Sequence, residues 1–219
     1  MSGACVMDER KLVIWGCGGM GREVLDLCEQ LGREVIGFLD DRPDMRGQTV
    51  DGVPVLGGLA DIVKLRGDVK VICAGVGSPV LKKRFVHQTK EHGFTLAETL
   101  VHPSVRLSPK NRLGLGSVIC EGAILTIHVR VGDFVIVNTR ATLAHDVTVA
   151  DYATISPGVN ISGNVSIGEG AFIGTGSALR EKITVGAWSV IGGGAFVKDD
   201  VPAGVLCAGV PAVVKKKLL

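Results

Sequence analysis

The chain has 219 residues with a formal net charge of +2, and 46% of its residues are hydrophobic, which is enough for a buried core without disulfide staples. A charge so nearly balanced excludes nucleic acid or an anionic membrane as the expected partner, and no apolar stretch reaches the roughly 20 residues of a membrane-spanning helix. Six cysteines without CxxC spacing, and an N-terminus without the pattern of a signal peptide, predict a cytoplasmic protein.

Residues 1–95 alternate between apolar runs of strand length and stretches with apolar residues at helical spacing. This alternation predicts a small α/β domain with a parallel sheet. An Asp-Gly pair at 51–52 predicts a tight turn. The expected strands are Lys11–Gly16, Glu34–Asp41 and Val69–Gly75, and the expected helices are Gly21–Gly32 and Pro79–Gly93.

A glycine-rich segment, GCGGMG, joins the first expected strand to the first expected helix. Backbone N–H groups at such a turn can hold a phosphate, although a merely tight turn is an equal alternative. Two acids about 20 residues later favour a nucleotide, because a carboxylate at the end of the second strand can accept hydrogen bonds from ribose or base. The predicted substrate-binding residues are therefore Gly16, Gly18, Gly19, Asp40 and Asp41.

From Val101 onward the sequence period changes to six. Every sixth residue from Val101 to Val197 is Val, Ile or Leu, and the residue four positions later is usually small or β-branched. A strict period of six fits neither a helix nor a single strand, but it fits a coil of short strands joined by corners. We therefore expect a hexapeptide-repeat parallel β-helix over residues 96–205, followed by a C-terminal tail over 206–219.

Both parts resemble known proteins. Hexads such as IGEGAFIGTGS and VGAWSVIGGGAF are similar to those of the left-handed β-helix acyltransferases, and IWGCGGMGREVLDLCEQLG with GFLDD resembles the nucleotide-binding domain of one branch. That branch comprises bacterial sugar N- and O-acetyltransferases of the sialic acid, bacillosamine and perosamine pathways. The resemblance implies a Rossmann-like N-terminal domain, a left-handed solenoid, acetyl-CoA as co-substrate and a homotrimer.

His145 lies two residues after Leu143, outside both inward-facing columns, so its imidazole should project from the solenoid wall. A histidine so placed is ordinarily a solvated surface residue. Histidine is nevertheless the natural general base near neutral pH, and Asp146 can orient its ring. In the resembling acetyltransferases a His followed by Asp or Glu at this repeat position is the catalytic base, which implies catalytic roles for His145 and Asp146.

A metal site is an alternative for this histidine, because γ-class carbonic anhydrases use the same solenoid with three histidine ligands. His128 precedes His145 by 17 residues, about one coil, but Ala150 stands where a third ligand would follow. Catalytic zinc normally has three protein ligands and an open fourth position. We therefore expect no metal.

The resemblance also bears on Met20, on Lys82 and on the C-terminal residues. The family usually carries His where this chain has Met20, so a ligand contact from that histidine does not carry over, and packing is the simpler role. The family often has a basic residue where this chain has Lys82, which we include as a substrate phosphate contact, with a solvated helix face as the alternative. The basic ending VKKKLL is expected to be a solvated tail.

The resemblance implies that acetyl-CoA binds in the groove between two neighbouring solenoids of a trimer, with its pantetheine amides hydrogen-bonded to solenoid backbone. Small residues suit such a groove, although glycine and serine also suit solenoid corners. The implied cofactor-binding residues are Asn138, Ser156, Gly163, Thr175 and Gly193.

The leading hypothesis is an acetyl-CoA-dependent N-acetyltransferase that acts on a nucleotide-linked 4-amino-4,6-dideoxy sugar for polysaccharide biosynthesis. The alternatives are O-acetylation of a sialic acid or another sugar, and a non-catalytic trimeric nucleotide-binding module. The intact His145–Asp146 pair and the unbroken hexads argue against the module. The sequence leaves the sugar and the nucleobase open among uridine, deoxythymidine and guanosine diphosphates.

Overall fold

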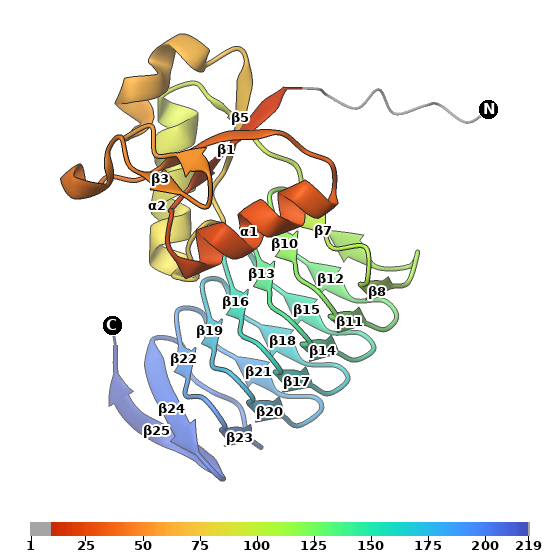
Figure 1. Ribbon diagram of the computed structural model, residues 1–219. Helices are drawn as coiled ribbons and strands as arrows, with labels where there is room; N and C mark the ends of the chain where they lie inside the picture. Colours follow the sequence, from red (N-terminus) through yellow and green to blue (C-terminus); the bar gives the residue numbers. More distant parts are fainter. Residues whose placement is uncertain (1–9, 219) are drawn as a thin grey trace.

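The computed structural model describes residues 10–218 and shows two parts, an α/β domain at the N-terminal end and a long solenoid beneath it (Figure 1). Within these residues, no helix combines the length and the apolar character needed to cross a membrane. The change of sequence period therefore corresponds to a change of architecture.

The N-terminal domain is built on a four-stranded parallel sheet in the order β2-β1-β5-β6. Its strands are β1 (Lys11–Trp15), β2 (Val35–Leu39), β5 (Val69–Ile72) and β6 (Thr95–Leu96). The helices are α1 (Gly19–Gln30) and α2 (Pro79–Glu91), with two short 3-10 helices, η1 (Pro43–Met45) and η2 (Leu59–Leu65). The three strands and two helices predicted from the sequence are confirmed, and β6 extends this sheet one residue past the expected boundary.

Local chemistry explains one hairpin turn and the start of one helix. The hairpin of β3 (Thr49–Val50) and β4 (Val53–Pro54) turns at Asp51 and Gly52, whose φ angles of 46° and 82° suit the tight turn that the Asp-Gly pair predicts. Helix α2 begins at a proline, and the Ser78 hydroxyl before it accepts a hydrogen bond from the N–H of Leu81. Both features are typical of helix starts.

The solenoid consists of two-residue strands that form three parallel sheets, one per side of a three-sided coil. The first sheet contains β7 (Leu100–Val101), β10 (Val118–Ile119), β13 (Ile136–Val137), β16 (Thr154–Ile155), β19 (Phe172–Ile173) and β22 (Val190–Ile191). The second contains β8 (Arg106–Leu107), β11 (Ile124–Leu125), β14 (Thr142–Leu143), β17 (Asn160–Ile161), β20 (Ala178–Leu179) and β23 (Phe196–Val197). The third contains β9 (Arg112–Leu113), β12 (Arg130–Val131), β15 (Thr148–Val149), β18 (Ser166–Ile167) and β21 (Thr184–Val185).

The hexad column is the solenoid core. Each strand pairs in register with the strand one coil later, as Val118 does with Ile136, so like residues stack on like. The second residue of each strand points inward, and nearly all of these residues are buried in one continuous cluster, while Leu107 in the first coil is 39% exposed. The period-six prediction of a parallel β-helix is therefore confirmed.

The N-terminal domain covers the first sheet. Leu100, Val118 and Ile136, the outward residues of three successive first-sheet strands, are buried in one cluster with Leu27 and Cys28 of α1. Figure 1 shows α1 lying across this side of the solenoid. The second and third sheets face away from the domain.

The C-terminal segment differs from the expected tail. Strand β24 (Val205–Gly209) pairs in parallel with β22, and β25 (Ala212–Lys217) turns back to pair with β24 in antiparallel orientation. Most of β25 is exposed, so its lysines are solvated as expected. The ordering comes from the free edge of β22, which offers backbone hydrogen bonds to any following strand.

Candidate active site

A cavity of about 530 Å³ opens at the carboxyl ends of β1, β2 and β5. Ligands of open parallel sheets bind at this edge, next to helix N-termini. The cavity brings together five of the predicted substrate-binding residues, Gly16, Gly18, Gly19, Asp40 and Asp41. Met20 also lines the cavity while packing against the core, in agreement with its predicted packing role.

The glycines of this turn serve two purposes. Gly16 has a φ of +106°, and a Cβ there would lie 2.6 Å from the carbonyl oxygen of Gly75, so the fold itself requires glycine. A Cβ on Gly18 or Gly19 would meet no atom within 4 Å, so packing does not exclude a side chain there. These two glycines leave the first turn of α1 open to the cavity, where its backbone N–H groups can approach an anion.

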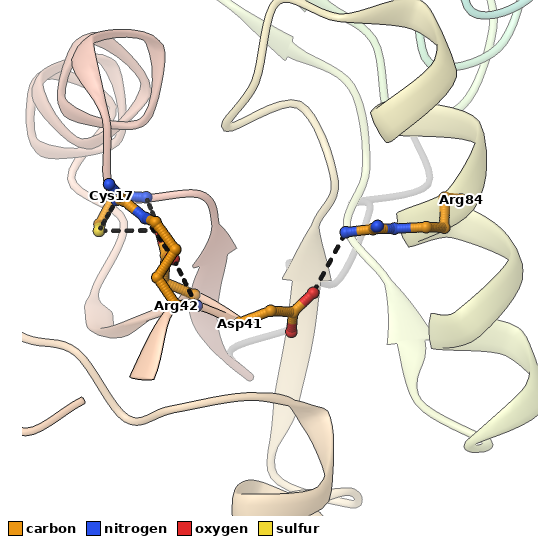
Figure 2. A network of polar contacts seen from close by, with 5 residues as sticks. Cys17, Asp41, Arg42 and Arg84 are labelled. Carbon is orange, nitrogen blue, oxygen red and sulfur yellow. Dashed lines mark hydrogen bonds and ion pairs between the residues drawn. The ribbon is translucent and has the colours of Figure 1, made fainter. Parts of the chain in front are cut away.

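Asp40 is held in place by hydrogen bonds from two neighbours, Cys17 and Arg42, whose side chains Figure 2 shows close together. Its carboxylate accepts hydrogen bonds from the Arg42 guanidinium at 2.9 and 3.0 Å and from the Cys17 thiol at 3.1 Å. The Arg42 contact holds the pKa of Asp40 well below its usual range, while burial and the nearby carboxylate raise the pKa of the Cys17 thiol. Near neutral pH, Asp40 is therefore a charged, oriented acceptor at the cavity edge.

Asp41 points the other way, toward α2 (Figure 2). Its carboxylate lies 3.2 Å from Nη2 of Arg84, and both side chains are about half exposed. Exposed ion pairs of this kind contribute little stability. Arg84 is therefore free to exchange its partner for an anionic ligand in the cavity at small cost.

Lys82 does not reach the cavity, which corrects the prediction that it contacts a phosphate. Its side chain is fully buried, and its Nζ donates to the carbonyl oxygen of Ala153 and the hydroxyl of Thr154, both at 2.9 Å. Those acceptors belong to the solenoid. The alternative of a solvated helix face is wrong for the same reason.

His145 lies at the corner between β14 and β15, where the second and third sheets meet. Its Nδ1 is 2.9 Å from Oδ2 of Asp146, and its side chain is 57% exposed. Asp146 adopts a φ of 60°, as residues at other corners of the solenoid also do. A carboxylate that accepts from Nδ1–H leaves the lone pair on Nε2, which is the arrangement of a general base.

Gly163 lies beside the imidazole, one coil later. A Cβ on Gly163 would come within 2.4 Å of Cε1 and 2.5 Å of Nε2 of His145, so the ring rests against this glycine. The backbone N–H groups of Ser162 and Asn164 donate to the carbonyl oxygens of Leu179 and His145. Gly163 N–H has no such acceptor within residues 10–218, and it is therefore available to a ligand.

The structure separates the residues expected to bind acetyl-CoA. Gly163 lies with His145 at the corner between the second and third sheets. The other four follow strands of the first sheet, at its corner with the second sheet: Asn138, Ser156, Thr175 and Gly193. A Cβ on Gly193 would lie 3.2 Å from the carbonyl oxygen of Thr175, so these two stack on successive coils. One chain therefore presents the two groups on different edges.

Comparison with known proteins extends this description. Residues 11–89 match the family model of the PglD N-terminal domain. A histidine variant of perosamine N-acetyltransferase from Caulobacter crescentus, solved with CoA and GDP-perosamine, is 31% identical with a TM-score of 0.87, and the match covers 99% of this chain and 100% of that chain. The chain belongs to the left-handed β-helix sugar acetyltransferases.

Two further solved structures are similar to this acetyltransferase. The acetyltransferase domain of PglB from Neisseria gonorrhoeae is 35% identical with a TM-score of 0.85, and the match covers 94% of this chain and 99% of that chain. WeeI from Acinetobacter baumannii is 27% identical with a TM-score of 0.84, over 93% of this chain and 99% of that chain. The search of curated proteins finds no match.

The acetyltransferase has cavity residues that the sequence reasoning missed. Arg42 and Arg84 line the cavity, and so do Trp15 and Phe85, whose rings stack with centroids 4.2 Å apart. Helical spacing offered a signal: Lys82 lies three and four residues before the apolar Phe85 and Val86, on the buried face of the helix, whereas Arg84 lies outside that series. For Arg42, which follows the predicted acid pair, the sequence carries no comparable signal.

Within residues 10–218, the acetyltransferase brings no three His, Cys, Asp or Glu side chains together as a metal site would need. His128 lines a small cavity of about 210 Å³ with Lys110, Arg112 and Arg130. Three cationic side chains beside His128 oppose the binding of a metal cation there. The expectation of a metal-free site stays a prediction.

Asp40→Asn is expected to lower the melting temperature at about pH 7. The gap between the melting temperatures of the variant and the parent protein should shrink as the pH falls below about 4. Because the folded-state pKa of Asp40 is depressed, its stabilisation is complete above the unfolded-state pKa and is lost as the pH falls toward the folded-state value. Calorimetry over this range measures the effect, with exposed Asp44→Asn as the control. A difference that stays constant with pH contradicts the role of Arg42.

Proposed function

We propose that the chain transfers the acetyl group of acetyl-CoA to the amine of a nucleotide-linked 4-amino-4,6-dideoxy sugar. The observation that carries the proposal is one chain with both an open nucleotide-sized cavity and an exposed His–Asp pair, similar over its full length to an enzyme solved with CoA and GDP-perosamine. PglB, another relative, has been solved with acetyl-CoA. In this proposal the N-terminal domain is Rossmann-like, and it holds the diphosphate and the base of the nucleotide.

The chemistry follows from the corner at His145. The substrate amine attacks the thioester carbonyl, a C–N bond forms, and Nε2 of His145 takes the proton that the amine loses. The Gly163 N–H stabilises the developing oxyanion, because it lies beside the imidazole and has no other backbone acceptor among the described residues. The C–S bond then breaks, and the thiolate of CoA receives the proton from His145.

The geometry favours a site shared between subunits of a trimer. The cavity lies in the domain that covers the first sheet, whereas His145 lies at the opposite corner, between the other two sheets. The four expected CoA residues at the corner of the first and second sheets do not meet His145 in one chain. In a closed cyclic assembly, each chain supplies one edge of the groove to its neighbour.

The test is an acetyl-transfer assay with acetyl-CoA and 4-amino-4,6-dideoxy sugars linked to UDP, dTDP or GDP. We expect release of the CoA thiol and an N-acetylated product with at least one of these acceptors. The matching 4-hydroxy sugars serve as controls and are expected to give no product. No thiol release with any amino sugar contradicts the proposal, and a monomer in light scattering contradicts the shared site. A cytoplasmic location remains part of the proposal.

A further inference from the structure

Lys82 is a fully buried lysine at the junction between the N-terminal domain and the solenoid. Its Nζ has two partners, Ala153 O and Thr154 Oγ1, and no carboxylate of residues 10–218 pairs with it. Burying an ammonium without a counter-charge is costly. Burial accordingly lowers the pKa of Lys82 well below its ordinary value. An apolar side chain would fill this position at lower cost, so packing alone does not explain the lysine.

The hydrogen bonds around Lys82 match those of a neutral amine. A neutral amine has two N–H groups, and the structure provides two acceptors at 2.9 Å. The Thr154 hydroxyl, which accepts from Lys82, donates its own hydrogen to the carbonyl oxygen of Gly77 at 2.8 Å. We call the chain Lys82–Thr154–Gly77 the junction relay. It connects α2, β16 and the loop after β5.

Thr154 interrupts an apolar column. Read from coil to coil, the outward residues of the first sheet are Leu100, Val118, Ile136, Thr154, Phe172 and Val190. Successive coils are alike in shape, so an apolar column by itself does not specify which coil lies under α2. Thr154 is the one hydroxyl in this series. A single buried polar contact in an apolar interface is an established means of fixing register.

The junction relay also ends at the nucleotide cavity, because Gly77 lines it. We propose that Lys82, through Thr154 and Gly77, is a positioning residue that fixes the N-terminal domain at one coil of the solenoid and so sets where the nucleotide cavity lies relative to the acetyl-transfer site. The consequence for catalysis rests on the proposed function. The registration of the two parts does not.

Two variants test the inference, Lys82→Met and Thr154→Val, each close in volume to the residue it replaces. We expect each to lower kcat about 100-fold, the effect of a displacement of about 1 Å at the reacting atoms. The dissociation constants for UDP, dTDP and GDP, measured by calorimetry, should stay near parental values because the cavity lining is intact. The kcat of the double variant should be no lower than that of the more impaired single variant, because each single substitution already breaks the same relay.

Lys83→Met is the matched control. Lys83 follows Lys82 in α2 and also contacts the solenoid, through an exposed ion pair of 2.8 Å with Glu169. Exposed pairs contribute little, so this variant should retain parental kcat. Hydrogen exchange provides a readout independent of activity: amides of the first-sheet strands under the domain should exchange faster in both relay variants and not in Lys83→Met.

Parental kcat and parental exchange in both relay variants overturn the inference. Faster exchange with parental kcat overturns its catalytic part. If the relay variants lose both nucleoside diphosphate binding and kcat, the inference is overturned, because the substitutions have then damaged the cavity itself. If Lys82→Met does not fold, Thr154→Val alone decides. If the parent protein transfers no acetyl group, the proposed function fails, and hydrogen exchange still decides the registration.

Discussion

Replacement of His145 by alanine is expected to lower turnover by roughly 10²- to 10⁴-fold, the usual contribution of general base catalysis. The fold should be unaffected, because the side chain is 57% exposed and its removal leaves no buried cavity. Steady-state kinetics with acetyl-CoA and the nucleotide amino sugar, followed by thiol release, measure the effect. Near-parental turnover would return His145 to the solvated surface residues.

Two variants place this result in context. His128→Ala removes another exposed corner histidine, about one coil earlier, and should leave turnover near the parental value. Asp146→Asn should lower turnover, because an amide does not select the Nδ1–H tautomer as a carboxylate does. Asparagine tolerates the positive φ of this position. A loss in Asp146→Asn therefore reports on the histidine tautomer and not on backbone strain.

Gly163→Ala is expected to lower turnover about 100-fold while leaving the melting temperature almost unchanged. The new Cβ would come within 2.4 Å of the imidazole Cε1. The imidazole is the mobile end of an exposed side chain, so it swings aside at little cost in stability. Nε2 then leaves the position from which the proposed mechanism has it accept the proton. Kinetics and thermal unfolding of the same preparation separate the two effects.

Gly67→Ala provides the control for this substitution. A Cβ on Gly67 would meet no atom within 4 Å, and its φ is not in the left-handed region. This variant should match the parent in turnover and stability. If Gly163→Ala also matches the parent, the ring does not rest against Gly163 in the working enzyme, and the oxyanion role of this glycine loses its support.

Much of the fold was predictable from short stretches of sequence. The column from Val101 to Val197 predicts the solenoid, because each coil buries the same positions against the same axis. Apolar runs and turn residues likewise predict the N-terminal strands and helices. Such patterns are local, and each is repeated or bounded within a few residues. The acids after β2 and the glycines before α1 were predictable for the same reason.

Contacts between distant segments were not predictable in this way. The sequence indicates a helix around Lys82 but not that Ala153 and Thr154 lie against it, so a buried junction residue was interpreted as a phosphate contact. Arg84, two positions later on the same helix, faces the cavity instead. The C-terminal segment was expected to be a solvated tail because it ends in the basic run VKKKLL. The free edge of β22, which orders it, is a property of the assembled sheet.

By itself the sequence determined the two architectures, the His145–Asp146 pair and the glycine and acid residues of the cavity, because periodicity, turn chemistry and motifs act over a few residues. Only the tertiary structure decided which groups meet. It places Arg42 and Arg84 at the cavity, buries Lys82 at the junction, and puts the cavity and His145 on opposite sides of the solenoid. The physical reason is that these outcomes depend on how the α/β domain docks on the coil, through contacts between residues more than 70 positions apart in the chain.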